Sequence, residues 1–149
     1  MATILIVEDE REISALTQSF IEEHGHKALS AATPDEALAI LNGSEVVDAL
    51  FVDIILKGDL QAGIELAKRA VEHKPTLKVL YSTGLTVTDD LKALVVPGST
   101  ILEKPYSEDQ LLANLSAHFG AGAQSYTPTS PASSSRSDGR GSVFSRTGA

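Results

Sequence analysis

Short apolar runs alternate along this chain with longer segments in which apolar residues recur every three or four positions. Runs of about four to eight apolar residues are typical of buried strands, and the wider spacing is typical of helices with one apolar face. Strands that alternate with helices predict a parallel sheet covered by helices on both faces. We therefore expect a doubly wound α/β domain whose strands span residues 3–7, 27–31, 49–53, 77–81 and 100–104.

Three of the expected helix starts carry a polar N-cap residue followed three positions later by Glu or Gln. This spacing is the pattern of a capping box, in which side chain and backbone satisfy each other's hydrogen bonds. The pairs are Asp9 with Glu12, Thr33 with Glu36, and Ser107 with Gln110. Thr88 predicts the start of a further short helix that ends near residue 94.

The composition changes after residue 119. Serine, glycine and proline make up half of residues 120–149, and no apolar periodicity remains there. A segment of this kind cannot offset the entropy lost on ordering. We expect one domain at residues 1–119 and a disordered tail at 120–149, which could serve as a linker, fold on a partner, or be a cloning remnant.

The charge and the apolar content exclude some classes of partner. Residues 1–119 carry 9 Lys and Arg against 19 Asp and Glu, a balance that argues against nucleic-acid binding. No apolar run approaches the roughly 20 residues of a membrane span, and the first residues lack the pattern of a secretion signal. The chain contains no cysteine, which fits a reducing compartment. We expect a cytoplasmic protein with neither a membrane nor a nucleic-acid partner.

Polar side chains stand where the expected strands end. Glu8 and Asp9 follow the first strand, Asp53 ends the third, Thr83 follows the fourth, and Lys104 ends the fifth. The carboxyl ends of parallel strands meet at one edge, so these side chains should lie together. Clustered carboxylates repel one another unless a cation lies among them, and Mg²⁺ prefers such oxygen ligands. With a lysine and a hydroxyl beside them, the set fits phosphoryl transfer to a carboxylate.

The ordered combination at successive strand ends resembles the receiver domain of two-component response regulators, of the stand-alone type. It consists of Glu8-Asp9, Asp53, Thr83-Gly84 and Lys104-Pro105, and the resemblance covers residues 2 to about 119. The family implies a flavodoxin-like fold of five parallel strands in the order 2-1-3-4-5 with five helices. It also implies that Asp53 accepts a phosphoryl group from a histidine kinase or a histidine phosphotransfer protein.

The resemblance assigns further roles by position. Thr83 would follow the phosphate on activation, Lys104 would pair with the phosphoryl oxygens, and the bond from Lys104 to Pro105 would be cis, which is essentially a proline property. The implied ligands of Mg²⁺ are Glu8, Asp9, Asp53 and the backbone carbonyl of Ile55.

Several functions remain to be weighed. The resemblance implies a single-domain response regulator that acts through protein contacts, catalyses only its own phosphorylation and dephosphorylation, and can form a homodimer through the fourth helix, fifth strand and fifth helix. An alternative is a receiver-fold docking module that works without phosphorylation. A haloacid-dehalogenase-type phosphatase is excluded, because Ile55 stands where that family needs a second acid. No G-x-G-x-x-G follows the first strand, which excludes dinucleotide binding.

The chain departs from the receiver pattern at three positions, and two further positions bear on dephosphorylation. Lys57 replaces a usual proline, and the loop glycine, Gly63, comes later than usual. Ile101 replaces the aromatic residue that usually moves with the threonine, so the usual switch cannot operate. Ile55 and Leu85 occupy positions that influence hydrolysis of the phosphoryl group. Both are apolar and cannot orient a water molecule, so we expect slow dephosphorylation.

Overall fold

The computed structural model describes residues 1–119, so the predicted tail at 120–149 lies outside the described residues. The strands are β1 (Thr3–Val7), β2 (Lys27–Ala31), β3 (Ala49–Asp53), β4 (Lys78–Thr83) and β5 (Thr100–Glu103). The helices are α1 (Arg11–Glu23), α2 (Pro34–Leu41), α3 (Ala62–His73), α4 (Asp89–Leu94) and α5 (Glu108–Phe119). Residues 1–114 form one compact unit, whose boundary lies within α5.

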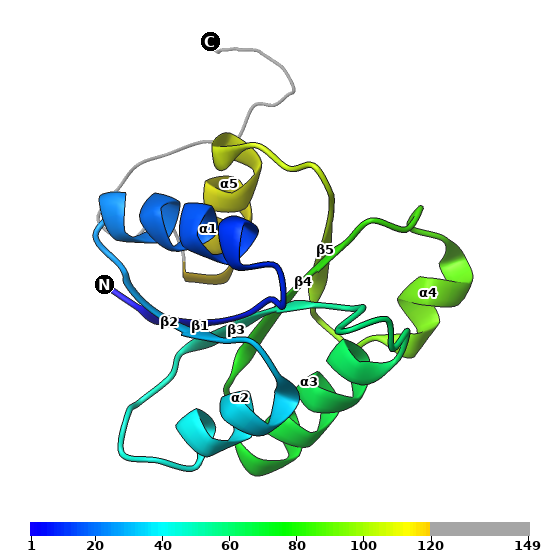
Figure 1. Cartoon of the computed structure of the whole chain (residues 1–149), viewed down its shortest axis with the longest axis horizontal. Helices are drawn as coiled ribbons and strands as arrows, with labels where there is room; N and C mark the ends of the chain where they lie inside the picture. Colours follow the sequence, from blue (N-terminus) through cyan, green and yellow to red (C-terminus); the bar gives the residue numbers. More distant parts are fainter. Residues whose placement is uncertain (120–149) are drawn as a thin grey trace, which may run out of the picture. The chain divides into compact units, whose positions relative to one another are not determined.

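The strands form one parallel sheet in the order β2-β1-β3-β4-β5, which confirms the predicted fold. Figure 1 shows α1 on one face of this sheet and α2 and α3 on the other. The register aligns the ends of neighbouring strands, since Asp53 pairs with Ser82 and Thr83 pairs with Glu103. The carboxyl ends of the strands therefore share one edge, as a parallel sheet requires.

Two of the interior strands, β1 and β3, are buried at every position. Strands covered on both faces read as continuous apolar runs, which explains why the bounds predicted for β1 and β3 match the structure. The main core lies between the sheet and the helices α2 and α3. From the helices it includes Ala37, Ile64, Leu66, Ala67 and Ala70. Within residues 1–119, no helix is long and apolar enough to cross a membrane.

The helix starts follow the predicted caps in three of four cases. The hydroxyl of Thr33 accepts a hydrogen bond from the backbone N–H of Glu36, and Thr88 caps α4 in the same way. Ser107 and Gln110 bond reciprocally through their side chains and backbone N–H groups. The cap predicted at Asp9 is wrong: Glu10 occupies the N-cap position of α1, and no side chain caps that helix.

The fourth strand extends further than predicted. We expected it to end at residue 81, but β4 continues through Ser82 and Thr83. Ser82 pairs with β3 on one side and β5 on the other, Thr83 pairs with β5, and both residues are buried. Pairing with two neighbours outweighs the turn preference of the Ser-Thr-Gly sequence, because a buried backbone must keep its hydrogen bonds.

Gly63 allows α3 to approach the strand that carries Asp53. It lies in the first turn of α3, where its N–H donates to the carbonyl of Ile54 over 3.0 Å. A Cβ at this position would lie 2.0 Å from the carbonyl oxygen of Asp53 and 2.8 Å from the Cα of Ile54. The helix can therefore pack here only because residue 63 lacks a side chain.

We predict that Gly63→Ala lowers the free energy of unfolding by at least the roughly 1–3 kcal/mol typical of an overpacked core. Alanine ordinarily stabilises a helix by about 1 kcal/mol relative to glycine. The sign of the change in the free energy of unfolding therefore distinguishes overpacking from helix propensity. Urea denaturation measures the change. Gly84→Ala is the matched control, because a Cβ there meets nothing within 4 Å and its stability should stay near that of wild type. A Gly63→Ala protein at least as stable as wild type would contradict the packing argument.

Candidate functional site

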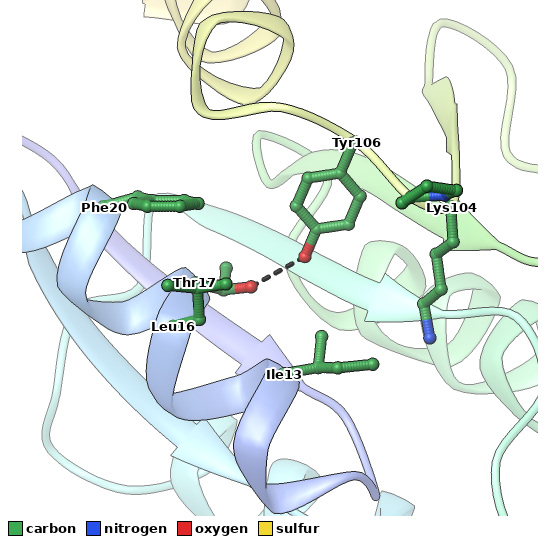
Figure 2. Close-up of a pocket in the computed structure, with 7 residues that line it drawn as sticks. Ile13, Leu16, Thr17, Phe20, Lys104 and Tyr106 are labelled. Atoms are coloured by element: carbon green, nitrogen blue, oxygen red, sulfur yellow. Dashed lines mark hydrogen bonds between the residues drawn. The ribbon is translucent and has the colours of Figure 1, made fainter.

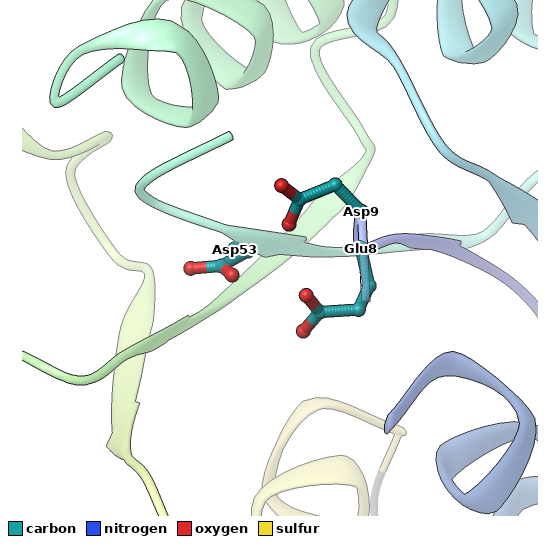
Figure 3. A group of neighbouring side chains, drawn as sticks. All are labelled: Glu8, Asp9 and Asp53. Atoms are coloured by element: carbon teal, nitrogen blue, oxygen red, sulfur yellow. The ribbon is translucent and has the colours of Figure 1, made fainter. Parts of the chain in front are cut away.

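The carboxylates of Glu8, Asp9 and Asp53 meet at the carboxyl edge of the sheet. One oxygen from each lies within 4.8 Å of the others (Figure 3). Glu8 and Asp53 are only 5% and 6% exposed, whereas Asp9 is half-buried. Glu8 and Asp9 follow β1 directly and Asp53 is the last residue of β3, so the alignment of neighbouring parallel strands brings them together.

The side chain of Lys104 bridges two of these carboxylates. Its Nζ lies 2.8 Å from Oδ2 of Asp53 and 3.0 Å from Oε1 of Glu8. The backbone N–H of Lys104 donates to the carbonyl of Thr83 over 2.7 Å, which fixes the end of β5 beside the end of β4. The lysine is 18% exposed, so its charge is largely removed from water and depends on these partners.

Burial and charge shift the pKa values of this cluster. Burial raises the pKa of Glu8 to about 7, although the hydrogen bonds from Lys104 and from the Glu10 backbone oppose the shift. Burial alone would lower the pKa of Lys104, but its hydrogen bonds to Asp53 and Glu8 outweigh that effect and the net pKa is raised. The cluster therefore crowds negative charge into a poorly solvated space, which is an environment that suits a divalent cation.

Thr83 and Ile55 are placed by local hydrogen bonds at the same edge. Thr83 is fully buried, and its hydroxyl oxygen accepts from the backbone N–H of Leu85 over 3.0 Å. The backbone N–H of Ile55 donates to Oδ1 of Asp53 over 3.2 Å. The two oxygens of Asp53 thus have different partners, one a backbone amide and the other the ammonium of Lys104.

Lys57 contributes to the site through its backbone, which the sequence did not reveal. Its N–H donates to Oδ2 of Asp9 over 2.9 Å, and its φ is 51°. Proline has no N–H and is held near φ ≈ −65°, so it could make neither this bond nor this turn. The bond also accounts for the missing cap on α1, because the carboxylate of Asp9 is directed to the loop after β3 instead of to the helix.

A pocket of about 360 Å³ opens beside Lys104. We call it the α1 pocket, and its lining residues are Ile13, Leu16, Thr17, Phe20, Lys104, Pro105 and Tyr106 (Figure 2). The hydroxyls of Thr17 and Tyr106 are 2.7 Å apart within it. The bond from Lys104 to Pro105 is cis, as the resemblance implied. The contact between Thr17 and Tyr106 joins residues 89 positions apart, so no local sequence pattern indicates it.

The half-buried Ile101 lies opposite Tyr81 in the register of β4 and β5. Tyr81 is fully buried, and its hydroxyl accepts from the backbone N–H of Val96 over 3.2 Å. The aromatic side chain in this part of the sheet therefore comes from β4 and fixes the segment that follows α4.

We predict that Glu8 makes the metal-free protein less stable as pH rises. The folded protein keeps the Glu8 proton up to about pH 7, whereas an unfolded chain loses it near 4.5. Between these values the folded state binds more protons, so its stability falls as pH rises. Glu8→Gln should remove this pH dependence of the stability. Urea denaturation between pH 4.5 and 7.5 in a chelator measures it, with Glu10→Gln as the exposed control. If the free energies of unfolding of wild type and Glu8→Gln changed with pH in parallel, the raised pKa of Glu8 would be contradicted.

Known proteins resemble this chain in sequence. A nitrogen assimilation regulatory protein, NtrX, of Azorhizobium caulinodans is 32% identical over 110 residues. The match covers 73% of this chain and 24% of that protein. A transcriptional regulatory protein, TcrA, of Mycobacterium tuberculosis is 32% identical over 136 residues, which cover 91% of this chain and 53% of the relative. The chain thus spans about half or less of these two curated relatives.

Solved structures and a family model give the same assignment. A response regulator receiver protein from Sinorhizobium medicae superposes with a TM-score of 0.72 at 26% identity, covering 80% of this chain and 95% of that one. A receiver domain protein from Methanospirillum hungatei gives 0.70 at 27%, with coverage of 78% and 92%. The model of the response regulator receiver domain matches residues 4–116. This chain therefore belongs to the receiver domains of two-component response regulators.

Proposed function

We propose that this receiver domain acts in a two-component system by accepting a phosphoryl group on Asp53. The observation that carries the proposal is the ammonium of Lys104, which lies 2.8 Å from Asp53 within the cluster of acids at the sheet edge. A cation beside the acceptor can neutralise charge on an incoming phosphoryl oxygen. The donor is the phosphohistidine of a histidine kinase or a phosphotransfer protein.

The reaction transfers one phosphoryl group. The bond between phosphorus and the donor's imidazole nitrogen breaks, and a bond between phosphorus and a carboxylate oxygen of Asp53 forms. The imidazole leaves with the electron pair of the broken bond. Lys104 then exchanges its contact with Asp53 for one with a phosphoryl oxygen, and the buried Thr83 adjusts to the phosphate. Beyond its own phosphorylation and dephosphorylation, the protein works as a signalling partner.

The donor set fits a Mg²⁺ ion. Carboxylate oxygens are its preferred ligands. Burial, with a smaller contribution from the charge of Asp53, raises the pKa of Glu8, so a cation would favour the ionised form of this acid. We propose that Glu8, Asp9, Asp53 and the backbone carbonyl of Ile55 hold it. When bound, Mg²⁺ neutralises charge that develops on the transferring group. Asp9 must then share its carboxylate between the metal and the N–H of Lys57.

Partner contacts follow from the surface around the site. We propose that the donor protein docks over the α1 pocket, because that pocket is apolar on the α1 side and reaches Lys104. Leu16 is 56% exposed there, which leaves apolar area for a partner to cover. The signal would pass in the cytoplasm to an unidentified downstream protein or to a second copy through the face of α4, β5 and α5. Because Ile101 is not aromatic, the signal would depend on a motion other than the usual aromatic switch.

A docking module that works without phosphorylation is the second candidate. Lys57 and Ile101, which depart from the receiver pattern, favour it, and the intact acid cluster argues against it. The two candidates differ in whether Asp53 is ever modified.

We predict that wild type incubated with acetyl phosphate and Mg²⁺ forms one phosphoryl adduct and that Asp53→Asn forms none, because the amide is not a nucleophile. Intact mass and a phosphate-retention gel detect the adduct. Asp35→Asn, which changes an exposed acid on α2, is the matched control and should be modified like wild type. Equal modification of wild type and Asp53→Asn would contradict the assignment. Absence of the adduct with both acetyl phosphate and a phosphohistidine donor would favour the docking module.

We predict that Ile55→Asn shortens the lifetime of the phosphorylated form. The half-buried Ile55 and the apolar Leu85 offer no hydrogen bond to a hydrolytic water, whereas an asparagine amide does. The decay of the adduct after removal of the donor should be several-fold faster, in keeping with a gain of about 1 kcal/mol from one hydrogen bond. Leu60→Asn, an exposed change in the same loop, should leave the decay unchanged. Equal lifetimes for wild type and Ile55→Asn would count against the idea.

A further inference from the structure

The segment Lys104–Tyr106 connects the acid cluster to α1. At its start, the backbone N–H of Lys104 is bonded to Thr83 and its ammonium contacts Asp53 and Glu8. At its end, the side chain of Tyr106 reaches the middle of α1. Figure 2 shows Lys104 and Tyr106 side by side on the wall of the α1 pocket, with the tyrosine directed at Thr17.

Tyr106 contacts two separate elements of the fold. Its hydroxyl lies 2.7 Å from Oγ1 of Thr17, which is 2% exposed. Its ring meets the ring of Phe51 edge-on, with centroids 5.6 Å apart and an interplanar angle of 63°, a favoured aromatic geometry. Phe51 stands two residues before Asp53 on β3, so the two side chains project from the same face of the strand. Tyr106 is thus held against the strand that carries the acceptor.

These contacts bear on the position of the lysine. A lysine side chain has several rotatable bonds and a compact charge, so it is confined only if its backbone and its partners are fixed. Pro105, which separates the lysine from the tyrosine, is exposed. The hydroxyl pair of Thr17 and Tyr106 fixes the far end of the segment, while the bond to Thr83 fixes the near end.

We infer that Tyr106 is a positioning residue whose hydrogen bond to Thr17 keeps the ammonium of Lys104 against Asp53. The inference rests on the proposed function in one respect, namely that Lys104 assists phosphorylation of Asp53. It adds that α1 takes part in the reaction through a hydroxyl contact 89 residues away in sequence. A substitution at Thr17 should therefore change how firmly the Lys104 side chain is held, through its effect on Tyr106.

The test compares variants that differ by one hydroxyl. Thr17→Val removes the hydroxyl of residue 17 and keeps its bulk, whereas Thr17→Ser keeps the hydroxyl. Tyr106→Phe removes the other partner and keeps the ring on Phe51. Tyr81→Phe is the matched control, because it removes a tyrosine hydroxyl that bonds to the backbone of Val96 instead. Thermal unfolding establishes that each full-length variant is folded.

Two readouts separate positioning from general stability. The first is the order parameter of the Lys104 side chain, measured by NMR on lysine labelled with ¹³C. The second is the rate constant for modification of Asp53 by acetyl phosphate at saturating Mg²⁺. A variant that merely weakens the fold lowers the melting temperature and leaves the order of Lys104 in the folded state unchanged.

We expect Thr17→Val and Tyr106→Phe each to lower the order parameter of Lys104 and to slow phosphorylation about three- to ten-fold, the range that follows from losing one hydrogen bond. The double variant should be no slower than either single variant, since both remove one shared interaction. Thr17→Ser and Tyr81→Phe should behave like wild type.

An unchanged order parameter of Lys104 in Thr17→Val and Tyr106→Phe would overturn the inference. The inference would also be overturned if Thr17→Ser and Thr17→Val lowered the order parameter of Lys104 and the phosphorylation rate equally. The methyl group of Thr17, and not its hydroxyl, would then be responsible. If wild type took up no phosphoryl group while Lys104 loosened as expected, the proposed function would fail and the positioning role of Tyr106 would stand.

Discussion

The ion pair between Lys104 and the acids at the sheet edge constrains the positions of the surrounding strand ends and loops. Charges removed from water are costly unless their partners are close and well oriented, and breaking such a pair by removing one partner typically costs several kcal/mol. Lys104 meets this condition with contacts of 2.8 Å to Asp53 and 3.0 Å to Glu8. These distances require the ends of β1, β3 and β5 to be held in register. The parallel sheet supplies that register, and the loops that follow the strands adjust it.

Two of these adjustments come from residues without an obvious chemical role. Gly63 lets α3 pack against the backbone of Asp53 and Ile54, where any side chain would collide. Lys57 adopts a positive φ and donates its N–H to Asp9. Gly63 thus fixes the end of the strand that carries Asp53, and Lys57 orients the carboxylate of Asp9. The departures from the receiver pattern at these positions are therefore structural solutions for holding the same acid cluster.

Much of this arrangement could be predicted from the sequence. The strands β1, β2 and β3 have the predicted bounds. β1 and β3 are apolar runs bordered by an acidic residue, Glu8 after β1 and Asp48 before β3. That Glu8, Asp9 and Asp53 lie near one another follows from the parallel pairing of β1 with β3. The continuation of β4 through Thr83, the carboxylate of Asp9 directed away from α1, and the contact of Tyr106 with Thr17 were not predictable. Each depends on a partner distant in sequence, which local patterns do not encode.

The most direct test of the account is to map the modified residue chemically. Full-length protein treated with acetyl phosphate and Mg²⁺ would be reduced with borohydride, which converts an aspartyl phosphate to homoserine, and then digested and sequenced by mass spectrometry. We predict homoserine at position 53 alone, at a level that falls when Mg²⁺ is chelated. Homoserine at position 9, or at another aspartate with position 53 unmodified, would contradict the assignment of Asp53 as the acceptor.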